Sequence, residues 1–168
     1  ITPSLMTLAD LSGYQAKKRE PVCTTYRSAY YVCSMSPPSS GGIAIAQAFG
    51  ILENFELKDH GPTQAENEGG VPSVMGVHLV SEAERLAYAD RDKYVADTDF
   101  VPLPGKGVSS MLDKNYLKSR ANLISKDKSM GVATAGTFDT VASARGIDTT
   151  VEHGTTHFSI IDLSLIHI

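Results

Sequence analysis

Residues 154–162 combine a glycine, two adjacent threonines and an alternating apolar run that predicts a β-strand, reading Gly154-Thr155-Thr156-His157-Phe158-Ser159-Ile160-Ile161-Asp162. A threonine becomes a strong nucleophile once the peptide bond before it is cut. Its own α-amino group then lies within reach of its hydroxyl and acts as the base. Thr155 is therefore a candidate catalytic nucleophile that is still joined to Gly154 in an uncut precursor, and Thr156 is a candidate assisting hydroxyl.

Two other interpretations of this stretch remain. Thr155 by itself would equally suit an ordinary strand threonine. His157 and Ser159 are two positions apart on one face of the predicted strand, but the sequence shows no acid to complete a catalytic triad with them.

The five histidines do not predict a metal site. His153 and His157 are four apart, but the first belongs to a predicted loop and the second to a predicted strand. No HExxH helix occurs, and the remaining histidines are scattered. We therefore expect neither a metal nor an organic cofactor.

Composition restricts the class of protein. A chain of 168 residues with 42% hydrophobic and 20% charged residues is long enough for one domain with a core. Its net charge of −4 argues against binding nucleic acid, which requires a basic face. No apolar run reaches the 18 residues that a membrane helix needs. Because the chain begins with Ile1 and not Met, we expect the true N-terminus and any targeting signal to lie outside it.

Several helices and one hairpin must carry the candidate nucleophile. Residues 22–26 and 29–35 are rich in Val, Thr and Tyr and predict two strands. Apolar spacing predicts helices over 43–55, 73–96 and about 110–124, and Ser73 is the expected cap of the second. Thr7 with Asp10 forms a capping-box pattern before a short helix. We expect the apolar face of the 43–55 helix to include Ile45 and that of the 73–96 helix to include Val80. The core contacts of the 110–124 helix are expected to include Met111 and Leu117.

Two further expectations concern polar segments. Five charged residues of the 73–96 helix are interpreted as a solvated face without chemistry: Glu82, Glu84, Arg85, Arg91 and Asp92. Residues 125–153 are rich in Gly, Ala, Ser, Thr and Asp, so they should bury little and be mobile up to the Gly154–Thr155 bond.

Cys23 and Cys33 are the two cysteines of the chain. They would face each other in a hairpin that turns near residues 27–29, and a cross-strand disulfide would then form in an oxidising compartment. Two buried free thiols are the plainer interpretation and the one that we favour. The spacing matches neither a zinc site nor a CxxC redox pair.

Six segments, in this order, resemble the γ-glutamyltranspeptidase family of the N-terminal-nucleophile hydrolase superfamily. They are residues 6–11 (MTLADL), 34–42 (SMSPPSSGG), 51–55 (ILENF), 82–91 (EAERLAYADR), 97–101 (DTDFV) and 155–162 (TTHFSIID). Two features depart from the family pattern: Ser36 stands where the family usually has proline, and residues 163–168 are atypical.

The resemblance implies a specific chemistry. Such a protein is made as one precursor that cuts itself into a large and a small chain, and the first Thr of the TTHFS-like motif becomes the nucleophile. Carried over, the cut falls between Gly154 and Thr155, so residues 1–154 belong to the large chain and residues 155–168 begin the small one.

The resemblance also implies the partners and the fold. The substrate would be glutathione or another γ-glutamyl compound, with water or an acceptor amino acid or peptide resolving the γ-glutamyl ester. The protein would be a heterodimer of large and small chains in the periplasm, outside the cell or at its surface. The fold class would be α+β, a fragment of the four-layer αββα sandwich with helices packed on antiparallel sheet.

Two alternatives stay open. The chain could be part of a non-catalytic homologue or scaffold that never processes. It could also belong to a relative that applies the same threonine chemistry to another amide, as a cephalosporin-type acylase or a poly-γ-glutamate hydrolase does. The fragment alone, lacking most of the small chain, is expected to be inactive and prone to aggregate.

Overall fold

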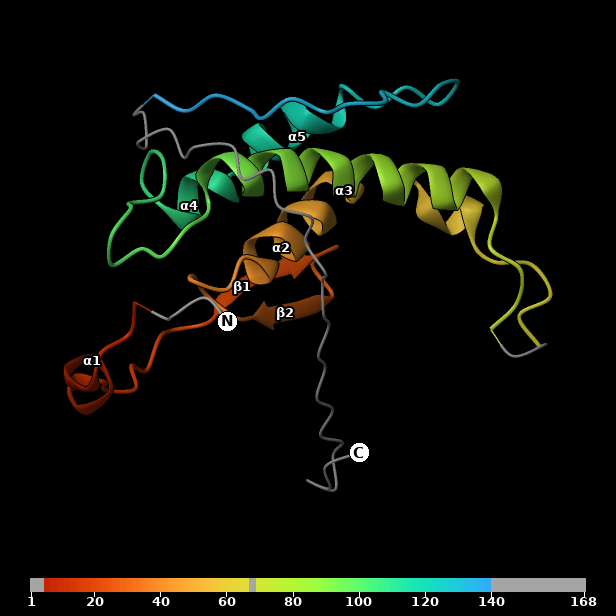
Figure 1. The fold of residues 1–168 in the computed structure, drawn as a ribbon. Coiled ribbons are helices and arrows are strands. Elements are labelled where there is room, and N and C mark those ends of the chain that lie inside the picture. The colour runs from red at the N-terminus through yellow and green to blue at the C-terminus, as the bar shows by residue number, and fades with distance from the viewer. Residues whose placement is uncertain (1–4, 67–68, 140–168) are drawn as a thin grey trace.

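The structure is a computed structural model, and it describes residues 5–66 and 69–139. Its elements stack in layers (Figure 1): a two-stranded hairpin lies on one side of helix α2 (Gly41–Leu52), and the long helix α3 (Val74–Tyr94) and helix α5 (Lys114–Ala121), which both contact α2, lie on the other. The elements in chain order are α1 (Leu8–Gly13), β1 (Val22–Tyr26), β2 (Tyr30–Ser34), α2 (Gly41–Leu52), the 3₁₀ turn η1 (Leu57–His60), α3 (Val74–Tyr94), α4 (Val108–Met111) and α5 (Lys114–Ala121).

The hairpin forms where the sequence predicts it. Strands β1 and β2 pair antiparallel, with Cys23 opposite Cys33. The turn places Arg27 and Ser28 at positive φ, 52° and 55°. The Arg27 side chain donates to the carbonyl of Phe55 at 2.6 Å, just beyond the end of α2, so the turn is anchored to the helix beneath it.

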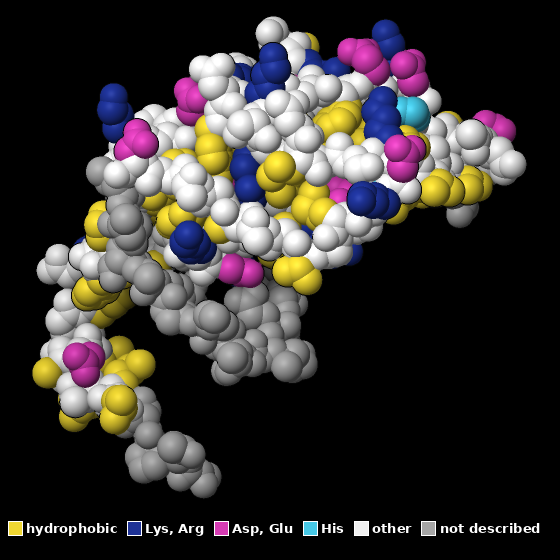
Figure 2. Space-filling view, turned by 90° about the horizontal axis from the view of Figure 1, so that it is seen from above, with side chains coloured by type: hydrophobic (Ala, Val, Ile, Leu, Met, Phe, Trp, Pro, Cys, Tyr) yellow, Lys and Arg dark blue, Asp and Glu magenta, His cyan; other side chains and the backbone are white. Residues whose placement is uncertain are grey.

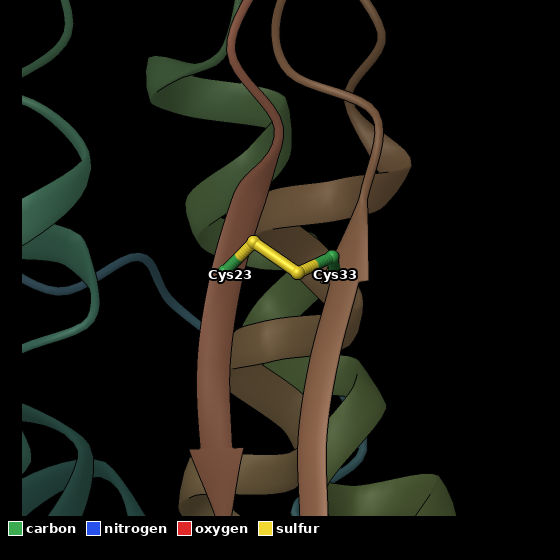
Figure 3. Close-up of a disulfide and its surroundings, with 2 residues drawn as sticks. All are labelled: Cys23 and Cys33. Atoms are coloured by element: carbon green, nitrogen blue, oxygen red, sulfur yellow. A yellow bond between two sulfur atoms is a disulfide. The ribbon is translucent and has the colours of Figure 1, made fainter.

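A disulfide joins Cys23 and Cys33 across the hairpin (Figure 3), with the two Cα atoms 4.1 Å apart. Side chains alternate along β1: Val22 is buried toward the core, so Cys23 lies on the opposite face of the pleat. On β2, Cys33 is exposed. The cross-strand disulfide is present, so the favoured interpretation of two buried free thiols is wrong.

Helix α2 is the central element of the described structure. It contacts both strands, α3, α4 and α5, and this explains why apolar residues occur on nearly all of its faces. Ile43 and Ile51 are fully buried, whereas Ile45, expected on the apolar face, is 46% exposed. Gly42 packs so closely that a Cβ there would lie 1.9 Å from the carbonyl oxygen of Met35.

Helix α3 matches its prediction closely. The Ser73 side chain caps its start by accepting from the N–H of Gly76 at 3.0 Å. Leu79, Ala83 and Leu86 are fully buried against α2 and α5, while Val80 is exposed, contrary to expectation. The helix ends at Tyr94, two residues before the expected end.

The single helix expected over 110–124 is wrong, because two helices occupy this stretch. Asp113 interrupts it: its carboxylate accepts from the N–H groups of Asn115 and Tyr116 at 2.9 and 3.0 Å, which is the geometry of an N-cap. A capped start of α5 therefore separates it from α4. The expected core contacts Met111 and Leu117 are both buried.

Helix α1 projects away from these layers (Figure 1), and none of its residues is buried. The predicted capping box is present: the Thr7 hydroxyl accepts from the Asp10 N–H, and the Asp10 carboxylate accepts from the Thr7 N–H at 2.7 Å. Two ion pairs connect the following segment to the body, from Lys17 and Arg19 to Asp99, both at 2.7 Å.

Residues 125–139 bury little, as predicted, since each of them is exposed or only partly buried. The segment nevertheless runs along α3 and α5, and some of its apolar side chains pack against both core clusters. Met130 and Ala133 contact one cluster, and Ala135 and Phe138 contact the other. The remainder of the predicted mobile tract, 140–153, lies outside the described residues.

Membrane-spanning helices and metal clusters are both absent from residues 5–66 and 69–139. Among these residues, no helix has the length and apolar content required to cross a bilayer. Within the same ranges, no group of three or more His, Cys, Asp or Glu side chains is arranged to hold a metal ion.

Candidate active site and the segment leading to it

The residues assigned chemistry from the sequence, Gly154, Thr155 and Thr156, lie outside the described residues. The structure therefore neither places them nor tests their roles. What it does describe is the segment of chain that runs toward them, and the helices that hold that segment. We call residues 129–138 the strap.

The start of the strap is held by Glu82 of α3. The Glu82 carboxylate accepts from the Ser129 hydroxyl at 2.7 Å and from the Met130 N–H at 2.8 Å. Arg85, one turn further along α3, donates to the carbonyl of Gly131 at 2.7 Å and pairs with Glu82 at 3.3 Å. The strap thus begins on two oppositely charged side chains that bind mainly its backbone.

The middle of the strap crosses a buried ion pair. Asp90 of α3 and Arg120 of α5 lie 3.4 Å apart, with side chains 2% and 5% exposed. Arg120 donates to the carbonyl of Thr134 at 2.7 Å, and Asp90 accepts from the N–H of Gly136 at 2.8 Å. The buried charges are therefore satisfied in part by the strap itself.

Gln47 and Tyr116 join the Asp90–Arg120 ion pair, and together they form a buried polar cluster. Asp90 also accepts from the Gln47 side chain at 3.0 Å and from the Tyr116 hydroxyl. Gln47 donates in addition to the carbonyl of Met111 at 3.1 Å. The cluster therefore connects α2, α3, α4 and α5 beneath the strap.

The end of the strap is held by aromatic side chains. The Tyr94 hydroxyl donates to the Gly136 carbonyl at 2.7 Å. The ring of Phe138 lies edge-on to Tyr94, with centroids 5.2 Å apart, and tilted against Tyr116 at 4.6 Å. A Cβ on Gly136 would lie 2.1 Å from the Tyr116 hydroxyl oxygen, so this position accepts only glycine without a shift.

The pKa shifts of Glu82 and Tyr116 agree with these contacts. Burial alone would raise the pKa of Glu82, but the hydrogen bonds from Ser129 and Met130, aided by the charges of His78 and Arg85, outweigh burial and hold the pKa below its usual value. Burial, followed by the hydrogen bond with Asp90 and its negative charge, raises the pKa of Tyr116. Glu82 is therefore an anionic acceptor and Tyr116 a protonated donor.

The role of Glu82 was not predicted from the sequence, which assigned it to a solvated face. It is 2% exposed. A signal did exist: Glu82 and Asp90 fall on the same helical stripe as the buried Leu79, Ala83 and Leu86. An acid on the apolar stripe of a helix indicates a buried, partnered carboxylate.

Comparison with known proteins gives a consistent result. The family model described as Gamma-glutamyltranspeptidase matches residues 2–164. The chain is 38% identical over 160 residues to a glutathione hydrolase proenzyme of Escherichia coli, an alignment that covers 94% of this chain and 24% of that protein. It is 36% identical over 150 residues to an acylase ACY 1 proenzyme of a Pseudomonas species, covering 84% of this chain and 25% of that protein.

Solved structures agree. The chain resembles the crystal structure of Helicobacter pylori gamma-glutamyltranspeptidase with a TM-score of 0.61 and 37% identity, covering 76% of this chain and 33% of that one. The enzyme of Pseudomonas nitroreducens, complexed with L-DON, matches with the same TM-score at 35% identity, covering 74% and 34%. The expected fold class is confirmed: a mixed fragment of helices and a small antiparallel sheet from the N-terminal-nucleophile hydrolase fold. The chain spans about a quarter of the length of the curated relatives it matches.

Proposed function

Because the chain belongs to the γ-glutamyltranspeptidase family, we propose that its parent protein removes γ-glutamyl groups from glutathione and related γ-glutamyl amides. When water accepts the γ-glutamyl group, the donor is hydrolysed. When an amino acid or peptide accepts it, a new γ-glutamyl compound forms. The observation that carries this proposal is the family match over residues 2–164, which includes the Thr155 motif.

The first reaction is self-cleavage. The Thr155 hydroxyl attacks the Gly154 carbonyl, the C–N bond between the two residues breaks, and an ester links Gly154 to the threonine side chain. Water hydrolyses this ester, which leaves the Gly154 carboxylate and frees both the hydroxyl and the α-amino group of Thr155. Thr156 assists as a neighbouring hydroxyl.

The second reaction uses the freed terminus. An α-amino group has an ordinary pKa of about 7.7 to 8.0, so near neutral pH a usable fraction is uncharged and can take the proton of the Thr155 hydroxyl. The hydroxyl oxygen attacks the γ-amide carbonyl, the amine leaves with a proton, and a γ-glutamyl ester remains until water or an acceptor amine resolves it. Every step is acid–base and acyl-transfer chemistry, which a threonine and its own amine supply.

The same proposal gives the chain organisation. Residues 1–154 form the C-terminal part of a large chain, residues 155–168 begin a small chain, and the two make a heterodimer from one precursor. The proenzyme names of the relatives in Escherichia coli and Pseudomonas support processing of this kind.

An acylase is the second candidate. The acylase ACY 1 proenzyme is 36% identical to this chain, close to the 38% of the glutathione hydrolase proenzyme. The threonine chemistry would be the same, and only the acyl group of the amide would differ. A non-catalytic homologue remains the alternative if no cut occurs.

The proposed location is an oxidising compartment. A Cys23–Cys33 bond persists where thiols are not kept reduced, and this supports a periplasmic, extracellular or cell-surface protein.

Mass spectrometry of the full-length parent protein tests the function. We expect two chains separated between Gly154 and Thr155, and a single intact chain for Thr155→Ala. Thr149→Ala is the matched control, a threonine close to the junction that should leave the cut unchanged. A wild-type protein that stays intact would contradict the proposed enzymatic function. Release from a γ-glutamyl anilide, compared with other acyl anilides, then separates a γ-glutamyltransferase from an acylase.

A further inference from the structure

The Cys23–Cys33 disulfide lies on the face of the hairpin that points away from the core (Figure 3). Cys33 is exposed and Cys23 is partly buried, so the two ends of the bond differ in their access to solvent. Thr25 and Tyr31, the next cross-strand pair on the same face, are exposed as well. This face of the hairpin is therefore open to small molecules in solution.

An exposed disulfide exchanges with thiols in solution, whereas a buried one is protected. A thiolate attacks one sulfur, a new S–S bond forms to that sulfur, and the other sulfur leaves as a thiolate. Because Cys33 is the more exposed residue, its sulfur is the one open to attack, and Cys23 is the leaving group. A second thiolate then releases Cys33, which leaves two protein thiols and one oxidised small-molecule disulfide.

Contacts other than the disulfide hold the hairpin in place. Val22 is 4% exposed and belongs to a buried core cluster. The ring of Tyr26 lies 5.0 Å from that of Phe49 on α2, and the Arg27 side chain donates to the Phe55 carbonyl at 2.6 Å. Opening the disulfide therefore leaves the two strands paired in the same register.

This placement favours reversal of the exchange. In the mixed disulfide on Cys33, the freed thiol of Cys23 still lies opposite on the neighbouring strand. It can attack Cys33 again, which expels the small thiol and restores the original bond. Attack within one molecule is favoured over attack from solution because the two groups are already held together. The bond can therefore open and close while the hairpin stays on α2.

We propose that the Cys23–Cys33 pair is a reversible thiol–disulfide exchange site for glutathione, with Cys33 as the attacked sulfur and Cys23 as the resolving thiol. Strands β1 and β2 contain no acidic residue that would repel the two carboxylates of this tripeptide. The ratio of reduced to oxidised glutathione would then determine what fraction of the hairpins is cross-linked. Only the choice of glutathione among small thiols rests on the proposed function, because the exchange does not use Thr155.

The first test compares the single variants Cys23→Ser and Cys33→Ser in the full-length parent protein. Both carry Thr155→Ala, so that the proposed reaction cannot consume the probe. Each is treated with oxidised glutathione, and peptide mass spectrometry follows the mixed disulfide at the remaining cysteine. Cys33 in the first variant should react severalfold faster than Cys23 in the second. In denaturant, where both cysteines are exposed alike, the two rates should converge.

The second test measures reversal with both cysteines present, again with Thr155→Ala. The protein is equilibrated in mixtures of reduced and oxidised glutathione, and free thiols at Cys23 and Cys33 are alkylated and counted by mass spectrometry. We expect the pair to open as the reduced share rises and to close again when oxidised glutathione is restored. The variant Cys23→Ser with Cys33→Ser gives the background from any other cysteine of the parent protein.

Each contrary outcome overturns a different part of the inference. Equal native rates for the two single variants contradict the assignment of Cys33 as the attacked sulfur. A pair that stays closed in reduced glutathione shows that this face is not open to the thiol in the parent protein, and the exchange site is then wrong. A pair that opens and does not close again contradicts the reversibility. None of these measurements depends on self-cleavage or turnover, so failure of the proposed function is seen separately, in a wild-type protein that stays intact.

Discussion

Asp90 is the residue on which the polar cluster converges. Its two carboxylate oxygens accept hydrogen bonds from the side chains of Gln47 and Tyr116 and from the N–H of Gly136, and they pair with Arg120. A buried carboxylate with this many partners is stable only while most of them remain, because each loss leaves charge without compensation.

Removal of the Tyr116 hydroxyl tests this dependence. Tyr116→Phe keeps the ring against Phe138 but deletes a donor to Asp90, so we expect a loss of about 1 to 3 kcal/mol in the free energy of unfolding. Chemical denaturation of the parent protein measures it. Tyr31→Phe, at a tyrosine 74% exposed, is the control and should change stability little. Equal stability of the two variants would contradict the role of the hydroxyl.

Among single residues, the sequence predicts a chemistry for Thr155 but misjudges the burial of Glu82. The role of Thr155 stays a prediction, and it is drawn from its neighbours in the chain, because a glycine, a second threonine and a strand pattern are all local. Glu82 was assigned to the surface because its partner lies 47 residues away, in Ser129. No local pattern identifies that partner, although the position of Glu82 on the apolar stripe indicates that one is needed.

Helix α2 begins in tight contact with the end of the hairpin. Gly42 faces the backbone of Met35, and the carbonyl oxygen there cannot move as a side chain would. Gly42→Ala should therefore destabilise the parent protein by about 1 to 3 kcal/mol. A Cβ on the neighbouring Gly41 would meet nothing within 4 Å, so Gly41→Ala should be neutral or slightly stabilising. Thermal unfolding of the two variants compares them, and a Gly42→Ala protein as stable as Gly41→Ala would refute the contact.

The disulfide restrains the hairpin on the face away from the core. It closes a short loop, with a sequence separation of 10, for which the chain-entropy model gives a stabilisation of about 2 to 3 kcal/mol. We expect reductant to lower the denaturation midpoint of the wild-type parent protein. The variant Cys23→Ser with Cys33→Ser should have the lower midpoint already and should not respond to reductant. A wild-type denaturation midpoint that is the same with and without reductant would show that the disulfide does not stabilise the protein.

The elements that were predicted well are those whose signals are local. The hairpin, the capping box at Thr7 and the Ser73 cap of α3 all follow from residues within a few positions of one another. The contacts of the strap were not predicted because its composition is that of a loop and its partners lie on α3 and α5. Asp113 was overlooked as a cap, since apolar residues continue on both sides of it.

Residues 5–21, which we call the N-terminal arm, are joined to the rest of the molecule by ion pairs. Hydrogen bonds from Arg19 and Lys17, together with their positive charges, lower the pKa of Asp99 from 3.8 to about 2. Because the pKa is lowered by folding, these pairs favour the attached arm above about pH 4, and that contribution is lost as the pH falls from about 4 to 2. Titration of the Asp99 carboxyl by NMR measures the midpoint. In Lys17→Gln with Arg19→Gln it should return toward 3.8, and an unchanged midpoint would contradict the pairing.

The arm also carries a run of exposed apolar side chains around α1, which Figure 2 shows on the projecting segment at its lower left. The exposed fractions range from 67% to 98%, for Leu5, Met6, Leu8, Leu11 and Tyr14. A short helix without a buried face gains little from its own capping box, so its apolar side chains favour contact with another surface.

The isolated chain of 168 residues should therefore self-associate as its concentration rises, which sedimentation velocity measures. Burying one leucine contributes about 1.5 to 3 kcal/mol, so Leu8→Gln with Leu11→Gln should shift association to higher concentration while glutamine preserves the helix. The control is Phe100→Gln with Val132→Gln, two exposed apolar residues away from the arm, 84% and 89% exposed. If the control weakens association as much as the arm variant, the contact is general apolar adhesion. If only the arm variant does so, α1 is the surface through which this part of the protein meets its neighbour.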